Sequence, residues 1–384
     1  DQGGQVRRTI LFAYESDAED IRVQSGRPYS ILTQLRALAS VINVSPLNRR
    51  ILQLLSPVER VFSAFDGIYR ADRQWVYLRW LARQVERAAA AQRCDVIFSP
   101  GSQAVTLLRE GTPMVFCADA PFGAMVDFYP YCSNITPLYR KHAFEQEASA
   151  HAGCAAAIYP SRWAADAAIK FHGAAPEKTH VIPFGANVDA PPASTIDSML
   201  RARGTSPLNV LFSGRDWPRK GGDLVVEACR LAREAGREVT LHVVGVGAEV
   251  VPPDSFIVVH GVLDKRNAAH RATLQHLLSI CHVFFTPSRA EAYGMSFCEA
   301  SAWAMPSLTT AVGGIPSIIE DGSTGWTLPP EADATAYAGK LLEMTSFSDL
   351  YRAMAWRARR DYEARLNWPA FIAALWPILR AVSQ

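Results

Sequence analysis

The chain is predicted to be an α/β protein with two similar halves, each built on a parallel sheet. A short apolar run, a turn marked by Gly or Pro and an amphipathic stretch follow one another repeatedly, which is typical of parallel strands joined by crossover helices. The same order starts again after residue 207, beyond a stretch rich in Pro, Ser and Thr. The length of 384 residues also favours two ordinary domains over one.

In the first half we expect six strands and four helices. Pro28 suits the opening turn of the first helix, because the missing N–H of proline has no helical partner there. The strands are expected at 9–14, 41–44, 95–99, 114–118, 155–159 and 181–184, and the helices at 28–39, 74–91, 138–151 and 162–171.

In the second half, strands are expected at 210–212, 240–244, 256–260, 283–286 and 307–310, each followed by a turn or helix. The aromatic stretch 366–382 is expected to be a helix that Pro377 kinks. The predicted divisions are a first domain at 6–189, a linker with a short helical piece at 190–207, a second domain at 208–364 and a C-terminal helix at 365–384. Ligands of open parallel sheets bind beyond the carboxyl ends of the strands, so functional residues are expected in loops that face a cleft between the halves.

Composition excludes several classes of protein. Lys and Arg number 39 against 37 Asp and Glu, so the formal charge of +2 gives no reason to expect a nucleic-acid partner. The 49% hydrophobic content argues against disorder. Seven scattered cysteines without a C-x-x-C pair indicate a reducing, cytoplasmic setting, and no apolar run is long enough to span a bilayer. Residues 1–5 show no signal-peptide pattern and are expected to be a trimmed start.

The loop 211–228 brings two cations to the start of a helix. A strand ends before the turn at Gly214, and Arg215 and Lys220 precede the Gly-Gly-Asp that opens the helix. Two cations and free helix N–H groups suit an anionic ligand, above all a phosphate or diphosphate. A solvated loop with capping residues is the alternative for this loop taken alone.

Two later loops add carboxylates and glycines. Glu291 lies between a buried strand and a helix that begins near Gly294 and carries Glu299. Carboxylates at this spacing suit sugar and ribose hydroxyls, although an acidic residue in a first turn is commonly only macrodipole compensation. In the loop 309–328, a Gly-Gly pair at 313–314 lets a ligand approach the backbone closely.

Together these segments resemble the retaining nucleotide-sugar glycosyltransferases of glycosyltransferase family 4. The resemblance rests on SGRDWPRKGGDLVVEA, on VVGVG at 243–247, on EAYGMSFCEA with its Glu-x7-Glu spacing, and on VGGIPSIIEDGSTGWTL, in the expected order over about 120 residues. It implies the GT-B fold, in which two Rossmann-like domains face each other across a cleft and the C-terminal helix returns to the first domain. It also implies that the second domain binds the donor and the first the acceptor.

The resemblance assigns a role to each matching residue. Arg215 and Lys220 would neutralise the donor diphosphate, Glu291 would lie near the hydroxyls of the transferred sugar, and Glu299 would bind the ribose. The stretch 260–265 would pack its backbone against the nucleobase. The donor-binding candidates are Gly26, Gly214, Arg215, Lys220, Gly261, Leu263, Glu291, Gly294, Met295, Ser296 and Glu299, and the catalytic candidates are Arg215, Lys220, Glu291 and Asp119.

The first half carries fainter signals. Gly26 stands alone where the family usually has a glycine-rich loop, and Asp119 stands where many members have a histidine. Asp119 either orients the acceptor hydroxyl or caps the following turn. The aromatic residues Phe122, Phe128, Tyr129 and Tyr131 are expected to be core, with a sugar-stacking wall as the alternative.

Residues 49–93 contain nine arginines and four acidic residues. The spacing of Trp75, Leu78, Ala82 and Val85 predicts a core-facing amphipathic helix with a solvated basic side. A docking face for anionic lipid is the alternative, which would place the protein peripherally on the inner face of a membrane.

The predicted function is retaining transfer of a glycosyl group from a nucleoside diphosphate sugar to an acceptor hydroxyl, in bacterial polysaccharide, lipopolysaccharide or glycolipid assembly. No cofactor and no metal are expected, since no metal-ligand spacing of histidines and no D-x-D in the second half are present. The expected partners are the donor and a carbohydrate, glycolipid or small-molecule acceptor. The alternatives are a sugar phosphorylase, a nucleotide-sugar 2-epimerase, a natural-product glycosyltransferase and a non-catalytic binding module.

Overall fold

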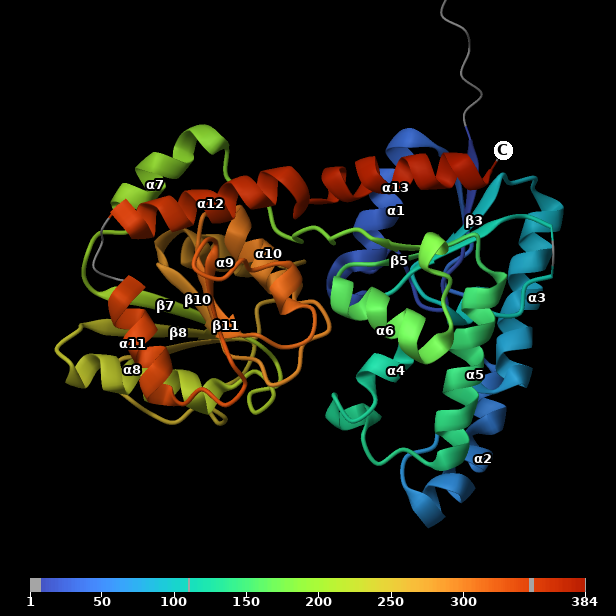
Figure 1. Cartoon of the computed structure of the whole chain (residues 1–384), viewed down its shortest axis with the longest axis horizontal. Coiled ribbons are helices and arrows are strands. Elements are labelled where there is room, and N and C mark those ends of the chain that lie inside the picture. Colours follow the sequence, from blue (N-terminus) through green and yellow to red (C-terminus); the bar gives the residue numbers. More distant parts are fainter. Residues whose placement is uncertain (1–7, 110, 345–348, 384) are drawn as a thin grey trace, which may run out of the picture. The chain divides into compact units, whose positions relative to one another are not determined.

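A computed structural model of the chain describes residues 8–109, 111–344 and 349–383. Its contacts divide the chain into two compact units. Unit 1 is built from the chain up to Pro183 and again from Trp368 onward, and unit 2 runs from Phe184 to Asn367. Figure 1 shows both units with their elements labelled.

Unit 1 contains a parallel sheet of six strands in the order β2-β1-β3-β4-β5-β6. Its C-terminal helix α13 (Trp368–Val382) packs against α1 (Arg27–Leu38), and the Nη1 of Arg8 donates to the backbone oxygen of Ser383 at 2.6 Å. The strands are β1 (Thr9–Phe12), β2 (Ser40–Asn43), β3 (Val96–Ser99), β4 (Met114–Cys117), β5 (Ala156–Tyr159) and β6 (Thr179–Val181). The α-helices are α1 (Arg27–Leu38), α2 (Ile51–Asp66), α3 (Trp75–Ala91), α4 (Phe122–Met125), α5 (Pro137–Gly153), α6 (Arg162–His172) and α13 (Trp368–Val382).

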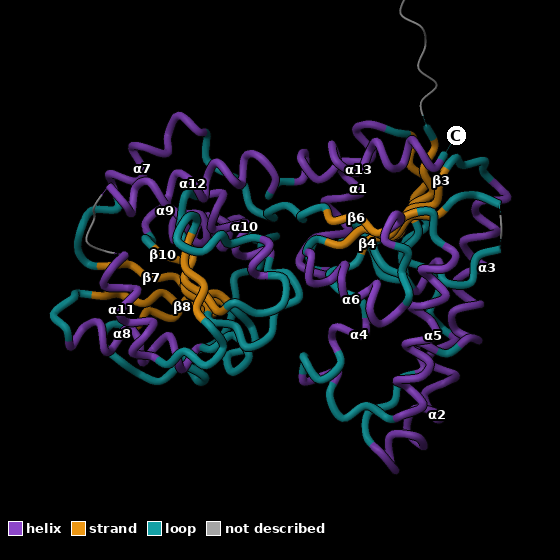
Figure 2. Tube along the Cα trace, in the orientation of Figure 1, coloured by secondary structure: helices purple, strands orange, loops and turns teal. Residues whose placement is uncertain are grey.

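Unit 2 contains a second parallel sheet of six strands, in the order β12-β11-β10-β7-β8-β9. Figure 2 shows the strands of each unit between layers of helix. The strands are β7 (Leu208–Ser213), β8 (Val239–Val244), β9 (Ile257–Gly261), β10 (Val283–Thr286), β11 (Ser307–Thr310) and β12 (Gly325–Leu328). The helices are α7 (Ile196–Ala202), α8 (Gly222–Glu234), α9 (Ala268–Ile280), α10 (Met295–Ala302), α11 (Ala334–Met344) and α12 (Asp349–Arg365).

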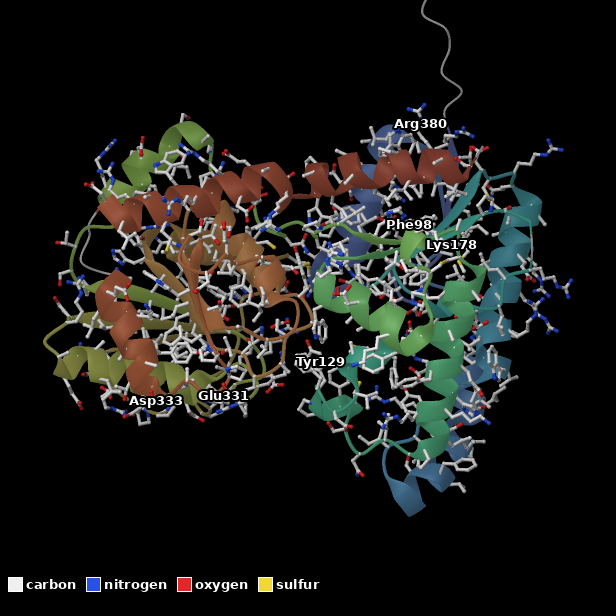
Figure 3. The ribbon with its side chains drawn as sticks, viewed as in Figure 1. Phe98, Tyr129, Lys178, Glu331, Asp333 and Arg380 are labelled. Atoms are coloured by element: carbon white, nitrogen blue, oxygen red, sulfur yellow. The ribbon has the colours of Figure 1, made fainter. Side chains whose placement is uncertain are left out.

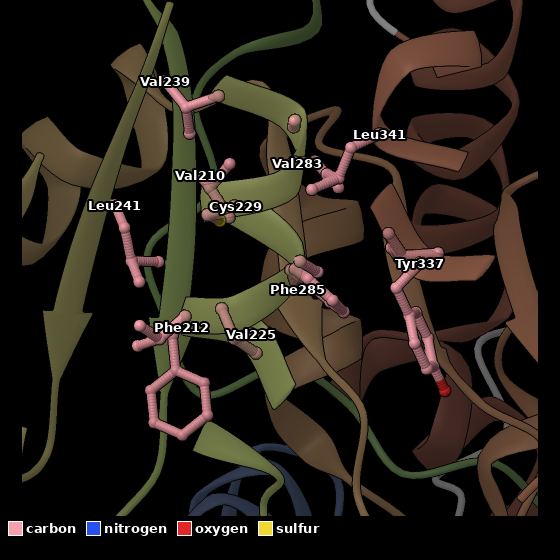
Figure 4. Close-up of a cluster of buried hydrophobic side chains, with 14 of the residues drawn as sticks. Val210, Phe212, Val225, Cys229, Val239, Leu241, Val283, Phe285, Tyr337 and Leu341 are labelled. Atoms are coloured by element: carbon pink, nitrogen blue, oxygen red, sulfur yellow. The ribbon is translucent and has the colours of Figure 1, made fainter. Parts of the chain in front are cut away.

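Each sheet is held by its own apolar core. In unit 2, Phe212 of β7 and Phe285 of β10 pack with Val225 of α8 and Tyr337 of α11 (Figure 4). In unit 1, the ring of Phe98 on β3 lies 5.8 Å from that of Phe12 on β1 (Phe98 is labelled in Figure 3). Burying an aromatic or aliphatic side chain of this size contributes about 1.5–3 kcal/mol, so these layers fix where the carboxyl ends of the strands lie.

The strand order reverses direction once in each sheet, and the reversal marks where ligands of such sheets bind. In unit 1 the reversal lies between β1 and β3, and in unit 2 it lies between β7 and β10. Because the two crossovers leave from these strands to opposite sides, the loops at their carboxyl ends separate and leave room for a ligand.

The predicted α/β fold with two parallel sheets is confirmed, but three elements differ from expectation. The strand expected at 181–184 is observed as β6, which ends at Val181. Helix α2 was not predicted, because Pro57 lies inside it and none of its described side chains is buried. Strand β12 was not predicted because its four residues follow a glycine-rich turn in a segment interpreted only as a loop.

The division between the units also lies earlier than the linker expected at 190–207. The backbone oxygen of Phe184 accepts hydrogen bonds from the Tyr293 hydroxyl at 3.0 Å and from the Cys298 thiol, and the Ala186 N–H donates to the Leu366 oxygen. These bonds attach the segment after Pro183 to unit 2. The short helix within 190–207 is α7, whose Ile196 and Leu200 pack against Ala304 and Ala355.

Candidate functional site

The reversal point of unit 2 holds a cluster of two cations, Lys220 and Arg219, and two carboxylates, Glu291 and Asp216, the last of which pairs with Arg219 at 3.0 Å. Lys220, at the end of the loop after β7, donates through Nζ to Oε2 of Glu291, in the loop after β10. Both side chains are largely buried, with 10% and 12% of their surface exposed. The Nη1 of Arg219 lies 3.7 Å from the same carboxylate oxygen and donates to the Ala290 oxygen at 2.7 Å. Ion pairs therefore join the loops after β7 and β10 at the reversal point of the sheet, where ligands of such sheets bind.

Backbone contacts hold these loops together. The N–H of Arg289 donates to the oxygen of Arg219 at 2.7 Å, which ties one loop to the other. The N–H of Gly314, in the third loop, donates to the oxygen of Glu291 at 3.1 Å. Three segments distant in the sequence therefore fix the position of the Glu291 carboxylate before any ligand binds.

Two glycines are required by the geometry of the cluster. A Cβ on Gly214 would lie 2.7 Å from Cγ of Lys220, so only glycine lets the lysine stem cross the end of β7. Gly294 adopts a φ of 97° at the start of α10, and a Cβ there would lie 2.6 Å from the Phe297 ring. Both positions were predicted as donor-binding glycines, and the structure gives each a steric reason.

A second ion pair joins α10 to the segment after β9, where further predicted residues lie. Glu299 on α10 accepts a hydrogen bond from Nζ of Lys265 at 2.6 Å, and the same ammonium donates to the Asn187 oxygen at 3.0 Å. Gly261 is the last residue of β9 and takes a φ of 69° with no described atom near its Cβ position. The remaining predicted residues here are half-buried, namely Leu263 after β9, and Met295 and Ser296 in the first turn of α10.

Arg215 stands apart from the Lys220 cluster. Its side chain is exposed and forms no ion pair with a carboxylate of the described residues. Arg219 is the arginine that reaches Glu291, and sequence reasoning missed it. The signal was present in the Pro-Arg-Lys order of 218–220, since residues adjacent to Lys220 share its turn.

In unit 1, a buried arginine connects the ends of two strands. Arg27, with 2% of its side chain exposed, donates through Nη2 to the Pro100 oxygen after β3 at 3.0 Å. Its Nη1 lies 3.6 Å from Oδ1 of Asp119, which follows β4 and has 43% of its side chain exposed. Burial alone would lower the pKa of Arg27, but its interactions with acidic neighbours, Asp119 first, outweigh burial and the net shift is upward. Sequence reasoning missed Arg27, since no motif marks it.

The turn before α1 departs from ordinary backbone geometry. Gln24, Ser25 and Gly26 have φ values of 45°, 57° and 87°, three successive left-handed residues within the 3-10 turn Val23–Gly26. Non-glycine residues adopt this conformation at a cost in strain, and such strain is concentrated at functional sites. The single glycine at 26 is thus accompanied by two strained residues where the family has further glycine.

Glu15 is a second residue of unit 1 that the sequence did not indicate. It follows β1, and its Oε2 is buried with no hydrogen-bond partner among the described residues. Its carboxylate lies near Gly101, because a Cβ there would be 3.7 Å from Oε1. Burial raises the pKa of Glu15, although the charges of Arg49, Arg73 and Arg27 act in the opposite direction. The β1–β3 reversal point therefore contains a carboxyl group that is destabilised when ionised.

The aromatic group of unit 1 is divided between core and surface. Phe122 and Tyr129 are buried, as expected of core residues. The Phe128 ring packs 5.1 Å from that of Trp163, and Tyr131 is exposed and stacks on Tyr129 at 5.1 Å (Tyr129 is labelled in Figure 3).

Metal-binding groups, disulfides and membrane spans are absent from the described part of the chain. No group of three or more His, Cys, Asp and Glu side chains among these residues is placed to hold a metal ion. All seven cysteines, which lie within the described ranges, are free thiols. No described helix has both the length and the apolar character needed to cross a membrane.

Comparison of the sequence with known families matches each half of the chain. Residues 34–190 match the family model described as Glycosyltransferase Family 4, and residues 201–361 match that described as Glycosyl transferases group 1. A putative colanic acid biosynthesis glycosyltransferase of Salmonella typhimurium is 26% identical over 224 residues, 56% of this chain and 54% of that protein. A D-inositol 3-phosphate glycosyltransferase of Xylanimonas cellulosilytica is 25% identical over 238 residues, 57% and 55% of the two chains. The chain thus matches about half the length of these curated relatives.

Solved structures agree in fold over nearly the whole chain. A glycosyltransferase from Rickettsia africae has a TM-score of 0.67 at 15% identity, covering 98% of this chain and 99% of its own. Anabaena Alr3699/HepE, solved in complex with UDP-glucose, has a TM-score of 0.65 at 16% identity, covering 97% and 99%. With both family models matched in order and the two parallel sheets observed, the chain belongs to the family 4 type of glycosyltransferases, with the GT-B fold.

Proposed function

We propose that this protein transfers a glycosyl group from a nucleoside diphosphate sugar to an acceptor hydroxyl, with retention at the anomeric carbon and without a metal ion. Unit 2 would bind the donor and unit 1 the acceptor. The observation that carries the proposal is the Lys220–Glu291–Arg219 cluster at the β7–β10 reversal point. The structure of the Anabaena protein in complex with UDP-glucose supports a donor of this class.

The cluster suits stabilisation of a leaving diphosphate. Breaking the bond between sugar and phosphate builds negative charge on the diphosphate, and a fixed cation stabilises that charge more in the transition state than in the ground state. The ammonium of Lys220 has three N–H donors, of which Glu291 accepts one, so two remain for phosphate oxygens. Arg219 and the N–H groups at the starts of α8 and α10 add positive potential at the same end of the sheet.

Glu291 and Glu299 would bind hydroxyl groups of the donor. Each is held by a lysine, Glu291 by Lys220 and Glu299 by Lys265. An ion pair fixes the carboxylate rotamer, and the oxygen lone pairs that the lysine does not use can accept hydrogen bonds from sugar or ribose. The position of Glu291 in the Lys220 cluster favours the transferred sugar, and that of Glu299 beside the β9 end favours the ribose.

Asp119 is proposed to bind the acceptor hydroxyl. The alternative role, as a cap of the following turn, is not supported by the contacts: α4 begins after Pro121 without a side-chain cap bond, and the described partner of Asp119 is Arg27. The half-exposed carboxylate is held from below by the buried guanidinium, so its outer oxygen is available for a hydroxyl. Bacterial polysaccharide, lipopolysaccharide or glycolipid assembly is the proposed setting, by analogy with the colanic acid glycosyltransferase of Salmonella.

A panel of activated sugars tests the proposal. UDP-, GDP-, ADP-, TDP- and CMP-sugars are added to the protein, and thermal unfolding is followed for each. A donor at 100 times its Kd is expected to stabilise the fold by about 2.7 kcal/mol. Nucleotide release and the anomeric configuration of the product are then measured with the best donor and a set of simple sugar acceptors.

Each outcome of the panel has a distinct meaning. Nucleotide release with an α-linked product from an α-linked donor supports retaining transfer. Inverted product would contradict retention, and glycosyl release by inorganic phosphate alone would indicate a phosphorylase. Conversion of the donor to its 2-epimer would indicate an isomerase, and binding without turnover on any acceptor would leave a binding module.

A further inference from the structure

Helices α2 and α3 of unit 1 expose apolar side chains that a solvated helix ordinarily buries. Leu54 on α2 is 78% exposed, and none of the described side chains of α2 is fully buried. By contrast, α3 buries one face in the core of unit 1 while its opposite face stays exposed. The exposed large apolar residues of the two helices are Leu54, Val61, Phe62, Trp75, Val76 and Trp80.

The two helices lie together on one side of unit 1. The indole Nε1 of Trp80 donates to the Asn48 oxygen at 2.6 Å, just before α2 begins, and the Phe62 ring lies 5.0 Å from that of Tyr69, between the helices. Figure 1 shows α2 and α3 as outer helices of this unit, at its margin beside α5. We call the exposed surface of α2 and α3 the α2–α3 face.

The α2–α3 face is also strongly basic. Val76, Trp80, Arg83 and Arg87 follow one another at helical spacing and are all exposed, so apolar and cationic side chains share one side of α3. On α3, the partly buried Arg79 pairs with Glu86 at 2.9 Å, but among the described residues no carboxylate forms an ion pair with the exposed arginines of this region. The exposed arginines from this part of the chain are Arg49, Arg50, Arg60, Arg70, Arg83, Arg87 and Arg93.

From this combination we propose that the α2–α3 face docks on the surface of a bilayer that contains anionic lipid. Basic side chains are attracted to the negative surface potential of such a membrane, and exposed leucine, phenylalanine and tryptophan side chains insert at the boundary between headgroups and acyl chains. Tryptophan is enriched at that boundary because its ring is apolar and its N–H is polar. The proposal is independent of the proposed glycosyl transfer, since the face contains none of the residues assigned to donor or acceptor.

Other occupants fit the face less well. A nucleic-acid backbone would match the arginines but would leave Leu54, Val61 and Val76 without an apolar partner. A second copy of the chain in a symmetric dimer would place the same patch against itself and bring its uncompensated arginines together. An anionic membrane surface offers both negative headgroups for the arginines and an apolar layer for the exposed apolar side chains.

Vesicle flotation tests the proposal. The full chain is mixed with vesicles of phosphatidylcholine alone, or of phosphatidylcholine and phosphatidylglycerol in equal parts, and the bound fraction is measured. Binding is expected only with the anionic vesicles and is expected to fall as salt rises. Each arginine near such a surface strengthens binding about fivefold, so the double variant Arg83→Gln/Arg87→Gln is expected to bind about 30-fold more weakly.

Matched variants test whether vesicle binding depends on the α2–α3 face or on the total charge and hydrophobicity of the chain. Arg201→Gln/Arg352→Gln removes two exposed arginines of unit 2 and is expected to bind as the unchanged chain does. Leu54→Gln/Val76→Gln is expected to weaken binding to anionic vesicles, whereas Leu350→Gln, at an exposed leucine of α12, is not. Thermal unfolding of each variant identifies any that fails to fold.

Several results would overturn the proposal. They are absence of binding to anionic vesicles, equal binding to both kinds of vesicle, and equal loss in the two arginine double variants. A shift from dimer to monomer in Leu54→Gln/Val76→Gln, measured by sedimentation without vesicle binding, would instead identify a surface for self-association.

Discussion

The reversal points of the two sheets arrange charge in opposite ways. In unit 2, two cations, Lys220 and Arg219, lie at the carboxylate of Glu291, and Arg219 is also paired with Asp216 at 3.0 Å. In unit 1, the cation is the buried partner: Arg27 is 2% exposed, whereas the carboxylate of Asp119 is half-exposed. A cationic surface favours an anionic ligand such as a diphosphate, whereas a supported carboxylate favours a hydroxyl. The same sheet topology therefore offers two chemically different sites.

If the two sites differ in this way, the largest loss of turnover is expected on replacing Lys220. Lys220→Ala removes the cation that contacts Glu291, and loss of one preorganised donor to a developing anion lowers kcat by about 10²–10³-fold. The fold is expected to survive, because Arg219 remains 3.7 Å from the Glu291 carboxylate. Steady-state turnover and thermal unfolding check both parts.

Lys340→Ala is the matched control for that variant. Lys340 forms a 2.7 Å ion pair with Glu343 on α11, away from the β7–β10 reversal point, and its loss should leave turnover unchanged. Turnover of a folded Lys220→Ala protein close to that of Lys340→Ala would contradict the leaving-group role.

A smaller effect is expected at the site of unit 1. Asp119→Asn keeps the size of the side chain and removes its charge, so a charge-assisted hydrogen bond to the acceptor is weakened. Such bonds contribute about 1.5–3 kcal/mol, which predicts a loss of about 10–100-fold in kcat/KM for the acceptor. The thermal shift produced by the donor should not change, because the donor binds to unit 2.

Asp127→Asn provides the control for Asp119→Asn. Asp127 is exposed in the same segment and already adopts a left-handed φ of 58° that asparagine tolerates. If Asp127→Asn lowered transfer as much as Asp119→Asn, or if Asp119→Asn weakened the donor, the division of roles between the units would be wrong.

A third effect, on donor affinity alone, is expected at Glu299 in unit 2. Glu299→Gln keeps a hydrogen-bonding side chain but removes the charge that Lys265 and a ribose would share, so donor affinity is expected to fall about tenfold. At saturating donor, kcat should remain near that of the unchanged chain, because the ribose is not part of the reacting bond. Isothermal titration with the donor measures the change, and Glu343→Gln is the matched control.

In unit 2, short sequence motifs at the ends of strands were enough to predict where several residues of the site lie. Gly214, Lys220 and Glu291 could be placed because each follows a recognisable strand, and parallel strands bring their carboxyl ends to one edge. The α/β class followed for the same reason, from the alternation of apolar runs and amphipathic stretches. The role of Arg219 was not predicted, because only the folded backbone decides which arginine of the loop, Arg215 or Arg219, reaches the Glu291 carboxylate.

Unit 1 was less predictable because its site depends on contacts between distant segments. The buried guanidinium of Arg27 depends on oxygens far along the chain, those of Pro100, 73 residues away, and of Asp119, and nothing around residue 27 indicates this. The buried Oε2 of Glu15 likewise depends on the end of β3. Charged residues are usually exposed, so the sequence alone favours the surface for both.

Glu15 provides the last test of the comparison, through stability and pH. Burial raises its pKa, so the folded state holds the proton more tightly than the unfolded state does. The carboxyl group therefore supports folding at low pH, and this contribution is lost as the pH rises through the raised pKa. Glu15→Gln should then stabilise the fold at about pH 8, by about 1 kcal/mol, and little at about pH 4. Urea unfolding at the two pH values measures this difference.

Glu19, four residues along the same loop, gives the opposite sign. Its pKa is lowered by a hydrogen bond from Arg36, so its contribution to stability is present above the ordinary carboxyl pKa and is lost as the pH falls. Glu19→Gln should therefore give no gain at the higher pH. A gain for Glu15→Gln accompanied by lower transfer would mean that this carboxyl group is kept for function at the expense of stability, as strained and unsatisfied groups at binding sites commonly are. Loss of stability at the higher pH would instead show that the three neighbouring arginines outweigh burial, and that Glu15 is a structural anchor of the β1–β3 reversal point.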